Sequence, residues 1–232
     1  MLTAVLGSAT ADIRAATFGG DLTAASDYIY RGISENDGRP AAQFDLHVGA
    51  NNGLFAGLWG TTLSTRQANF QLQPYVGMRF ALSSEWSATV SAAYYRYFEH
   101  AGVPSDDYQE LSVAFSYLDA FTFSLAASPD TVHYWRGLRV GRYAAYDASV
   151  TGQWQLFGPV FVTAGAGYYY LTGPAPPSWG TQGYGYGNVG LALERGPWRV
   201  TVGYYLAGSQ AENLFPYSAS NNRVAAALTW RF

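Results

Sequence analysis

Apolar and polar residues alternate at a period of two along nearly the whole sequence. Between residues 70 and 80, each even-numbered residue is apolar, and the residues between them include Gln71, Gln73 and Arg79. Such alternation is typical of β-strands with one apolar and one polar face. The sequence therefore predicts an all-β fold of about twelve strands, near residues 22–30, 41–49, 54–61, 69–80, 86–96, 108–117, 121–128, 145–156, 160–170, 184–193, 198–206 and 222–232.

The predicted strands are joined alternately by long and short connections. The short connections contain turn-forming residues, as in Asn51-Asn52-Gly53 and Gly158-Pro159. This layout is typical of an up-and-down antiparallel β-barrel, with tight turns at one rim and longer loops at the other. Because the number of strands is even, both termini are expected at the rim with the short turns, on the periplasmic side.

Composition favours a barrel that is transmembrane. Charged residues make up 12% of the chain, against about a quarter in soluble proteins, and no run of apolar residues is long enough for a spanning helix. Twelve strands enclose more space than one layer of side chains fills, since about eight already do so. The apolar face is therefore expected to contact lipid and the polar face to line the lumen. All 13 basic residues are arginine and the net charge is -3, which argues against nucleic acid as a partner.

Aromatic residues of the predicted outer face gather at the two ends of the strands, as in the girdles of membrane barrels. At the short-turn ends they are Phe80, Trp86, Phe121, Phe157, Trp198, Trp230 and Phe232. Toward the long loops they are Tyr28, Tyr30, Tyr94, Tyr168, Tyr170, Tyr184 and Tyr204. We expect both groups to lie where hydrocarbon meets the headgroups.

The two ends of the chain predict export to a bacterial outer membrane. Residues 1–11 end in the small-residue triplet Ala9-Thr10-Ala11 and are interpreted as the remnant of a signal peptide, which leaves 12–232 as one barrel domain. The last strand ends on Phe232, and a terminal aromatic residue resembles the end of outer-membrane barrels, which the barrel-insertion machinery reads. The expected surroundings are outer-membrane lipid and lipopolysaccharide.

The string SDYIYRGIS at residues 26–34, followed by Gly38-x-Pro40 and by GLFAGLWGT at residues 53–61, is similar to the TorF family of porins. The positions that fit the motif of the first string are Asp27, Tyr28, Arg31 and Gly32. The resemblance covers the first three predicted strands closely. It implies a Gram-negative outer-membrane barrel and carries over no catalytic residue.

The polar face of the predicted strands carries charges of both signs. The charged residues predicted to line a pore are Asp27, Arg31, Asp45, His47, Arg79, Glu110, Asp147, Glu194, Arg199, Arg223 and Arg231. One interpretation is a narrow aqueous passage for small polar solutes, with no strong preference for either charge. The alternative is that opposite charges pair across the lumen and fill it together with Tyr75, Tyr95 and Tyr169.

Residues 129–144 are predicted to form a loop rich in arginine. The candidates for ligand binding in this loop are His133, Trp135, Arg136, Arg139 and Arg142. The loop could fold into the barrel as a constriction, bind an anionic sugar or lipopolysaccharide group outside, or stay solvated without a ligand.

The sequence predicts no catalytic, cofactor or metal site. Cysteine is absent, and the three histidines, His47, His100 and His133, follow no metal-binding spacing. The predicted function is a passive channel for small polar solutes. The second hypothesis is a closed barrel that is structural or binds through its long loops. The third is a lipid hydrolase, which would need a serine beside a histidine base.

Overall fold

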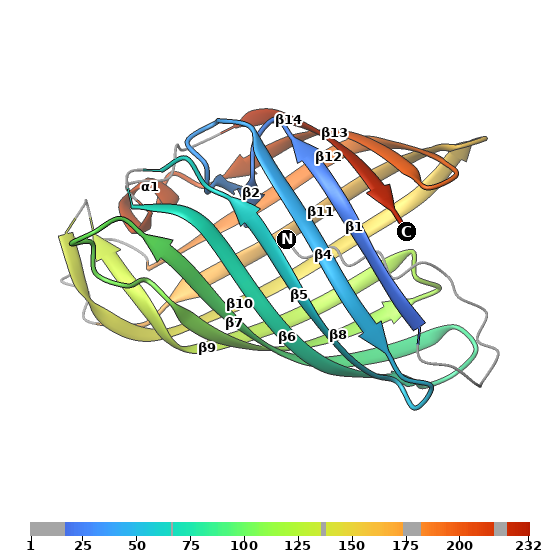
Figure 1. The fold of residues 1–232 in the computed structure, drawn as a ribbon, viewed down its shortest axis with the longest axis horizontal. Helices are drawn as coiled ribbons and strands as arrows, with labels where there is room; N and C mark the ends of the chain where they lie inside the picture. The colour runs from blue at the N-terminus through green and yellow to red at the C-terminus, as the bar shows by residue number, and fades with distance from the viewer. Residues whose placement is uncertain (1–16, 66, 136–137, 174–181, 216–221) are drawn as a thin grey trace.

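The computed structural model describes residues 17–65, 67–135, 138–173, 182–215 and 222–232, and within them twelve antiparallel strands close into one barrel (Figure 1). The barrel strands are β1 (Thr17–Ala25), β4 (Ala41–Gly49), β5 (Leu54–Thr62), β6 (Ala68–Ala81), β7 (Trp86–Glu99), β8 (Tyr108–Tyr117), β9 (Phe121–Trp135), β10 (Leu138–Phe157), β11 (Val160–Leu171), β12 (Gly183–Arg195), β13 (Trp198–Ala207) and β14 (Arg223–Arg231). The predicted fold class is therefore confirmed.

Three short elements lie outside the barrel ladder. The strands β2 (Ile29–Tyr30) and β3 (Ile33–Ser34) pair with each other in a separate two-stranded sheet. The helix α1 (Ala211–Leu214) lies in the connection between β13 and β14. In the described part of the chain, no helix is both long and apolar enough to cross a membrane.

Two of the predicted strand boundaries are wrong. β1 covers Thr17–Ala25 rather than 22–30, so the whole SDYIYRGIS string at residues 26–34 lies beyond its end. β9 and β10 continue through most of residues 129–144, which were predicted as a loop. Both errors concern residues at the same end of the barrel, where the functional interpretation depends on them.

Every strand pairs with its neighbour in sequence order, and β1 closes the barrel by pairing with both β4 and β14. Phe232 completes the closure, because its backbone N–H donates to the Gly20 carbonyl at 3.0 Å and its own carbonyl accepts from Gly20 N–H at 3.0 Å. Closure leaves no free strand edge, which is the condition for a sheet to cross hydrocarbon.

The two rims differ as the connection lengths predicted. One rim, the turn rim, carries the connections 50–53, 82–85, 118–120, 158–159 and 196–197. The other, the loop rim, carries 26–40, 63–67, 100–107, 136–137, 172–182 and 208–222. All of these except 136–137, where a long loop was predicted, are longer than the connections of the turn rim. Figure 1 shows α1 and the β9–β10 hairpin at one end of the molecule and the C-terminus toward the other. Thr17, the first described residue, pairs with Gly49 beside a short turn, so it also lies at the turn rim.

The outer face of the barrel is apolar. In β6, Val76 and Phe80 point outward and are exposed, whereas Gln71 and Gln73 point inward and are buried. All seven aromatic residues predicted for the short-turn ends are exposed, and so are Tyr94, Tyr168, Tyr170 and Tyr204 toward the loop rim. Exposed apolar side chains with aromatic ends form the band that contacts lipid in membrane barrels.

Three tyrosines were assigned to this outer band wrongly. Tyr28 and Tyr184 are buried, and Tyr30 is half-buried, all within clusters inside the barrel. Tyr28 and Tyr30 follow the end of β1 and enter the lumen with the chain. Tyr184 belongs to β12, where Tyr184 and Tyr186 point inward and the intervening Gly185 points outward.

The lipid-facing assignment predicts a large effect of a charge near the middle of β12. Val189 is 55% exposed on the outer face. We expect Val189→Arg to lower the free energy of unfolding by about 2–4 kcal/mol, because the charge would enter the hydrocarbon near its midplane. Urea unfolding in lipid vesicles, followed by heat-modifiable gel migration, measures this difference. Val189→Leu is the matched control, and equal stability of the arginine variant would contradict the assignment.

Candidate functional site

The chain turns into the barrel directly after β1. Residues 29–34, which we call the lumen hairpin, form β2 and β3 around a two-residue turn. The turn residues Arg31 and Gly32 have φ of 48° and 80°, as in the type I′ turns that suit tight hairpins. A Cβ on Gly32 would lie 2.3 Å from the Leu206 carbonyl oxygen, so the tip of the hairpin lies directly against the backbone of β13.

Arg31 fastens the lumen hairpin to the far wall of the barrel. Its Nη2 donates to Glu110 Oε2 on β8 at 2.7 Å, and its Nε lies 3.5 Å from Asp147 Oδ1 on β10. The three side chains are 10%, 11% and 9% exposed. The guanidinium also lies over the rings of Tyr30 and Tyr169, at 4.6 and 4.9 Å from their centroids. A cation held by two carboxylates and two aromatic faces forms a latch across the lumen.

A second set of polar contacts holds the base of the lumen hairpin. Ser34 Oγ donates to Asp27 Oδ1 at 2.7 Å, and Arg223 Nη1 on β14 donates to Asp27 Oδ2 at 2.6 Å. Asn36 is fully buried, and its amide donates to the carbonyls of Arg39 and Pro40. These buried groups therefore have the partners that their desolvation requires.

Apolar packing covers the lumen hairpin from the loop rim. Ile33 is buried in a cluster with Leu171, Tyr169 and Tyr184, and Leu214 of α1 belongs to the same cluster. Burial of a side chain such as Ile33 contributes about 1.5–3 kcal/mol. The lumen hairpin and α1 therefore pack together at the loop end of the barrel.

The opposite half of the lumen, toward the turn rim, is polar, and we call it the wet half because its charged side chains are accessible to water. Four of its charged side chains keep substantial exposure, at 36% for His47, 31% for Arg79, 33% for Arg231 and 28% for Glu194, whereas Asp45 and Arg199 are 14% and 10% exposed. Most of them form ion pairs, as between His47 Nδ1 and Asp45 Oδ1 at 2.6 Å. Charged groups that face inward and remain this exposed require water in this part of the barrel.

Other ion pairs complete this half of the lumen. Arg79 Nη2 lies 2.5 Å from Asp119 Oδ1, Arg199 is paired with Glu194, and Arg231 Nη1 lies 3.6 Å from the same Glu194. Each of these guanidiniums therefore lies beside a carboxylate.

The residues predicted to line a pore come together in three groups. Arg31, Glu110 and Asp147 form the latch, and Asp27 with Arg223 holds the hairpin base. The third group, in the wet half, consists of Asp45, His47, Arg79, Glu194, Arg199 and Arg231. Tyr75, Tyr95 and Tyr169 also point inward: Tyr75 donates to Asp45, and Tyr95 donates to Glu110. Whether any of these residues contacts a solute stays a prediction.

Sequence reasoning missed the residues that make the hairpin itself. Ser34 and Asn36 were not singled out, and Arg31 was placed on the wall rather than on an inserted turn. The signal was present, since Arg31-Gly32 between alternating aromatic and aliphatic residues is a possible hairpin turn. The short strands of two residues each were concealed by the continuing alternation of β1.

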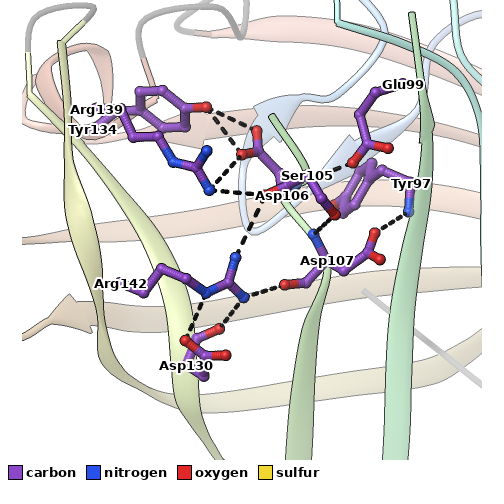
Figure 2. Close-up of polar contacts among 9 residues, drawn as sticks. All are labelled: Tyr97, Glu99, Ser105, Asp106, Asp107, Asp130, Tyr134, Arg139 and Arg142. Atoms are coloured by element: carbon purple, nitrogen blue, oxygen red, sulfur yellow. Dashed lines mark hydrogen bonds and ion pairs between the residues drawn. The ribbon is translucent and has the colours of Figure 1, made fainter. Parts of the chain in front are cut away.

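The arginine-rich segment 129–144 is a hairpin rather than a loop. It extends β9 and β10 beyond the other strands of the loop rim (Figure 1). Arg142 reaches across to Asp130 at 2.6 Å and to the carbonyls of Ser105 and Asp107. Arg139 donates to the Ser105 carbonyl at 2.8 Å (Figure 2). The two guanidiniums therefore bind the connection 100–107.

The remaining ligand-binding candidates of this segment differ in position. His133 is fully buried, with its ring edge-on to Tyr143 at 5.8 Å. Arg136 and the side chain of Trp135 lie outside the described residues. The prediction of a loop at residues 129–144 is wrong, because most of them belong to β9 and β10, and Arg139 and Arg142 contact the connection 100–107. A ligand-binding role of this segment stays a prediction.

Histidine positions bear on the enzyme hypothesis and on metal binding. His47 contacts Asp45, and His100 lies within 3.4 Å of Asn69 and 3.3 Å of the Thr65 carbonyl. In the described ranges, no three His, Asp or Glu side chains are grouped so as to hold a metal ion.

Comparison with known proteins adds a family and a fold. Residues 9–173 match the family described as "Bacterial protein of unknown function (Gcw_chp)". No curated protein matches the chain.

Among solved structures, the NanC porin is similar with a TM-score of 0.58 and 10% identity, covering 90% of this chain and 97% of that one. The KdgM porin has a TM-score of 0.54 and 10% identity, covering 92% and 99%. KdgM in complex with disordered oligogalacturonate gives a TM-score of 0.54 at 9% identity, covering 92% and 99%. These likenesses show the same barrel fold. A closed barrel with an apolar exterior in a bacterial protein places the chain in the outer membrane.

Proposed function

The chain belongs to the bacterial family Gcw_chp, and we propose that it is a narrow outer-membrane channel for small polar solutes, closed at its loop end by the lumen hairpin. The observation that carries this proposal is the wet half of the lumen. A barrel that served only as a scaffold would be expected to fill its interior with packed side chains. Here His47, Arg79 and Arg231 point inward and are each about a third exposed.

The comparisons support the proposal at the level of fold. NanC and KdgM are named as porins and are covered almost completely by this chain, so the barrel has the size of theirs. The similarity of residues 26–34 to the TorF family of porins agrees with this, and we propose that the chain is a porin of that type. The motif residues Arg31 and Gly32 would then act in the turn of the closing hairpin, and Asp27 would hold its base.

The second candidate is a closed barrel without a channel. The burial of Ile33 and the latch at Arg31 favour it, because both keep the loop end shut. The two candidates differ in whether the lumen hairpin leaves the lumen often enough for solutes to pass through the barrel. The latch is made of a few polar contacts rather than of a covalent link, which supports an opening channel.

We also propose the surroundings and the partners. Outer-membrane lipid and lipopolysaccharide would contact the apolar outer band. Phe232, whose ring is exposed and whose backbone closes the barrel onto β1, would be read by the barrel-insertion machinery. The chain is proposed to carry no catalytic site, and it would show no lipid turnover.

Single-channel recording of the refolded protein in a planar bilayer tests the channel. Heat-modifiable gel migration first establishes that the barrel is folded. We expect brief or small conductance steps from the natural sequence, because the lumen hairpin closes the loop end most of the time. Folded protein that stays silent, both in its natural form and after the hairpin is displaced by mutation, would contradict the channel and favour the closed barrel.

A further inference from the structure

A cavity of about 120 Å³ lies at the loop rim, beside the lumen hairpin. Its walls come from the lumen hairpin, from β6, β7, β8, β9, β11 and β12, and from the connections that include residues 63–67 and Asp106. The tyrosines that line it are Tyr30, Tyr97, Tyr108, Tyr134, Tyr169 and Tyr184. A concave site with so many aromatic faces is suited to a ligand rather than to bulk water.

Three carboxylates also line this cavity. They belong to Glu35 after the hairpin, Glu99 at the end of β7 and Asp106 in the following connection. Glu99 Oε1 accepts from the Asp106 backbone N–H at 3.0 Å, and both Asp106 oxygens accept from Tyr134 (Figure 2). No hydrogen bond from another described residue reaches the carboxylate of Glu35.

Among the described residues, the positive charge around the cavity does not balance these carboxylates. Arg31 is the guanidinium in its wall, and it is already held by Glu110 and Asp147. Arg139 approaches Asp106 only to 3.9 Å and gives its hydrogen bond to the Ser105 carbonyl. The cavity therefore keeps an excess of negative charge next to aromatic faces.

We propose that this cavity is a binding site for small organic cations, such as amines or quaternary ammonium compounds. Aromatic faces attract a cation through their quadrupole, and nearby carboxylates add Coulomb attraction. If the proposed channel function holds, the cavity would be the solute site at its outer entrance, and the solutes would be cationic rather than merely polar. This specificity rests on the proposed function, but binding itself does not.

A site that binds an acidic sugar would need the opposite charge, an excess of positive groups. KdgM is described in complex with oligogalacturonate, an anionic ligand. Among the described residues that line the cavity, an anion would meet the carboxylates of Glu35, Glu99 and Asp106. The one guanidinium of this lining, Arg31, is already paired with two carboxylates. Like charges at an entrance reject a ligand even where the shape allows it.

Protonation of Glu35 should make the binding depend on pH. Burial raises the pKa of Glu35 to about 7, with Asp106 and Asp27 raising it further and Arg31 lowering it. Burial also raises the pKa of Asp106, against the hydrogen bond from Tyr134 and the charge of Arg139. The Glu35 carboxyl is neutral below pH 7 and charged above it. Cation affinity is therefore expected to increase between pH 6 and pH 8.

The test is titration of the folded barrel in detergent with choline, followed by NMR line broadening of the choline methyl signal. We expect saturable binding at pH 8 that weakens at pH 6. Glu35→Gln combined with Glu99→Gln should weaken it about tenfold or more. Tyr97→Leu, which keeps an apolar wall but removes an aromatic face, should also weaken it. Glu85→Gln, at the turn rim, is the control for loss of a carboxylate and should bind as the natural chain does.

Several results would overturn the proposal. They are absence of choline binding by the natural folded chain, equal binding by the double glutamine variant, and binding of trigalacturonate as tight as that of choline. The channel proposal fails separately: a barrel that binds choline but never conducts contradicts the channel alone. A barrel that conducts but does not bind choline contradicts the cation site alone.

Discussion

Replacement of Gly32 by alanine is expected to drive the lumen hairpin from its place and to increase the conductance of the barrel several-fold. The added Cβ would lie 2.3 Å from the Leu206 carbonyl oxygen and 2.8 Å from Tyr186 Cβ. Neither atom can move away easily, because the Leu206 oxygen belongs to the backbone of a strand and the Tyr186 Cβ is bonded directly to one. Moving the tip away also withdraws Arg31 from its two carboxylates.

The matched control for this change is Gly102→Ala. Gly102 has φ of 85°, close to the 80° of Gly32, but a Cβ there would meet nothing within 4 Å. Both variants therefore share the cost of about 1–2 kcal/mol for a left-handed non-glycine residue, and only Gly32→Ala adds a clash.

Trypsin gives a second measurement of the displaced hairpin. In the natural chain Arg31 is buried in the lumen, so the bond after it is protected. We expect cleavage after Arg31 in Gly32→Ala and not in Gly102→Ala. A folded Gly32→Ala barrel with unchanged conductance and no cleavage at Arg31 would contradict the hairpin as the closing element.

Replacement of Arg31 by alanine is expected to lower the free energy of unfolding by about 3–5 kcal/mol. Glu110 and Asp147 would remain inside the barrel without their shared cation, and a buried charge without a partner is strongly destabilising. The loss should also make the lumen more selective for cations, because two carboxylates become uncompensated. Urea unfolding and the reversal potential in a salt gradient measure the two effects.

Arg79→Ala is the comparison for this prediction. Arg79 and Asp119 also form an ion pair at 2.5 Å, but their side chains are 31% and 47% exposed. An exposed pair contributes about 0–1 kcal/mol. Adding Glu110→Gln and Asp147→Asn to Arg31→Ala should restore much of the lost stability, since the stranded charges disappear. Equal effects of Arg31→Ala and Arg79→Ala would contradict the buried latch.

The barrel strands could be predicted from the sequence because lipid imposes a rule on every outward position. A side chain that faces hydrocarbon must be apolar, so the alternation in segments such as 69–80 and 145–156 records which face is outside. Turn residues mark the short connections in the same local way, as at Gly158-Pro159. These signals need no knowledge of distant residues.

The alternation of apolar and polar residues gave wrong predictions in segments where neither face of the strand contacts lipid. Residues 26–34 alternate in the same way whether they extend β1 or turn into the lumen, because a hairpin inside the barrel also has two faces. For the same reason Tyr28 and Tyr30 were assigned to the outer band. In β12, Tyr184 could not be distinguished from a girdle residue until its packing against Tyr169 and Phe215 was known.

The prediction of a loop for the arginine-rich segment 129–144 was wrong for a different reason. Beyond the bilayer, outward positions no longer need to be apolar, so Arg139 and Arg142 can stand on strands. Their long side chains find carbonyl and carboxylate partners in residues 105–107, which precede them by more than thirty positions. A composition that is typical of a loop can therefore also belong to an extended hairpin.

The sequence alone determined the all-β class, the strands and the difference between the rims, because each depends on neighbours two residues apart. Only the tertiary structure decided that the lumen hairpin enters the loop end of the barrel and which charges lie beside it. Glu110 lies in β8 and Asp147 in β10, so Arg31 contacts them only once the barrel strands from β4 to β10 are in place. No local sequence pattern encodes these contacts. The physical reason is that lipid acts on each residue separately, whereas the latch and the cavity depend on barrel closure.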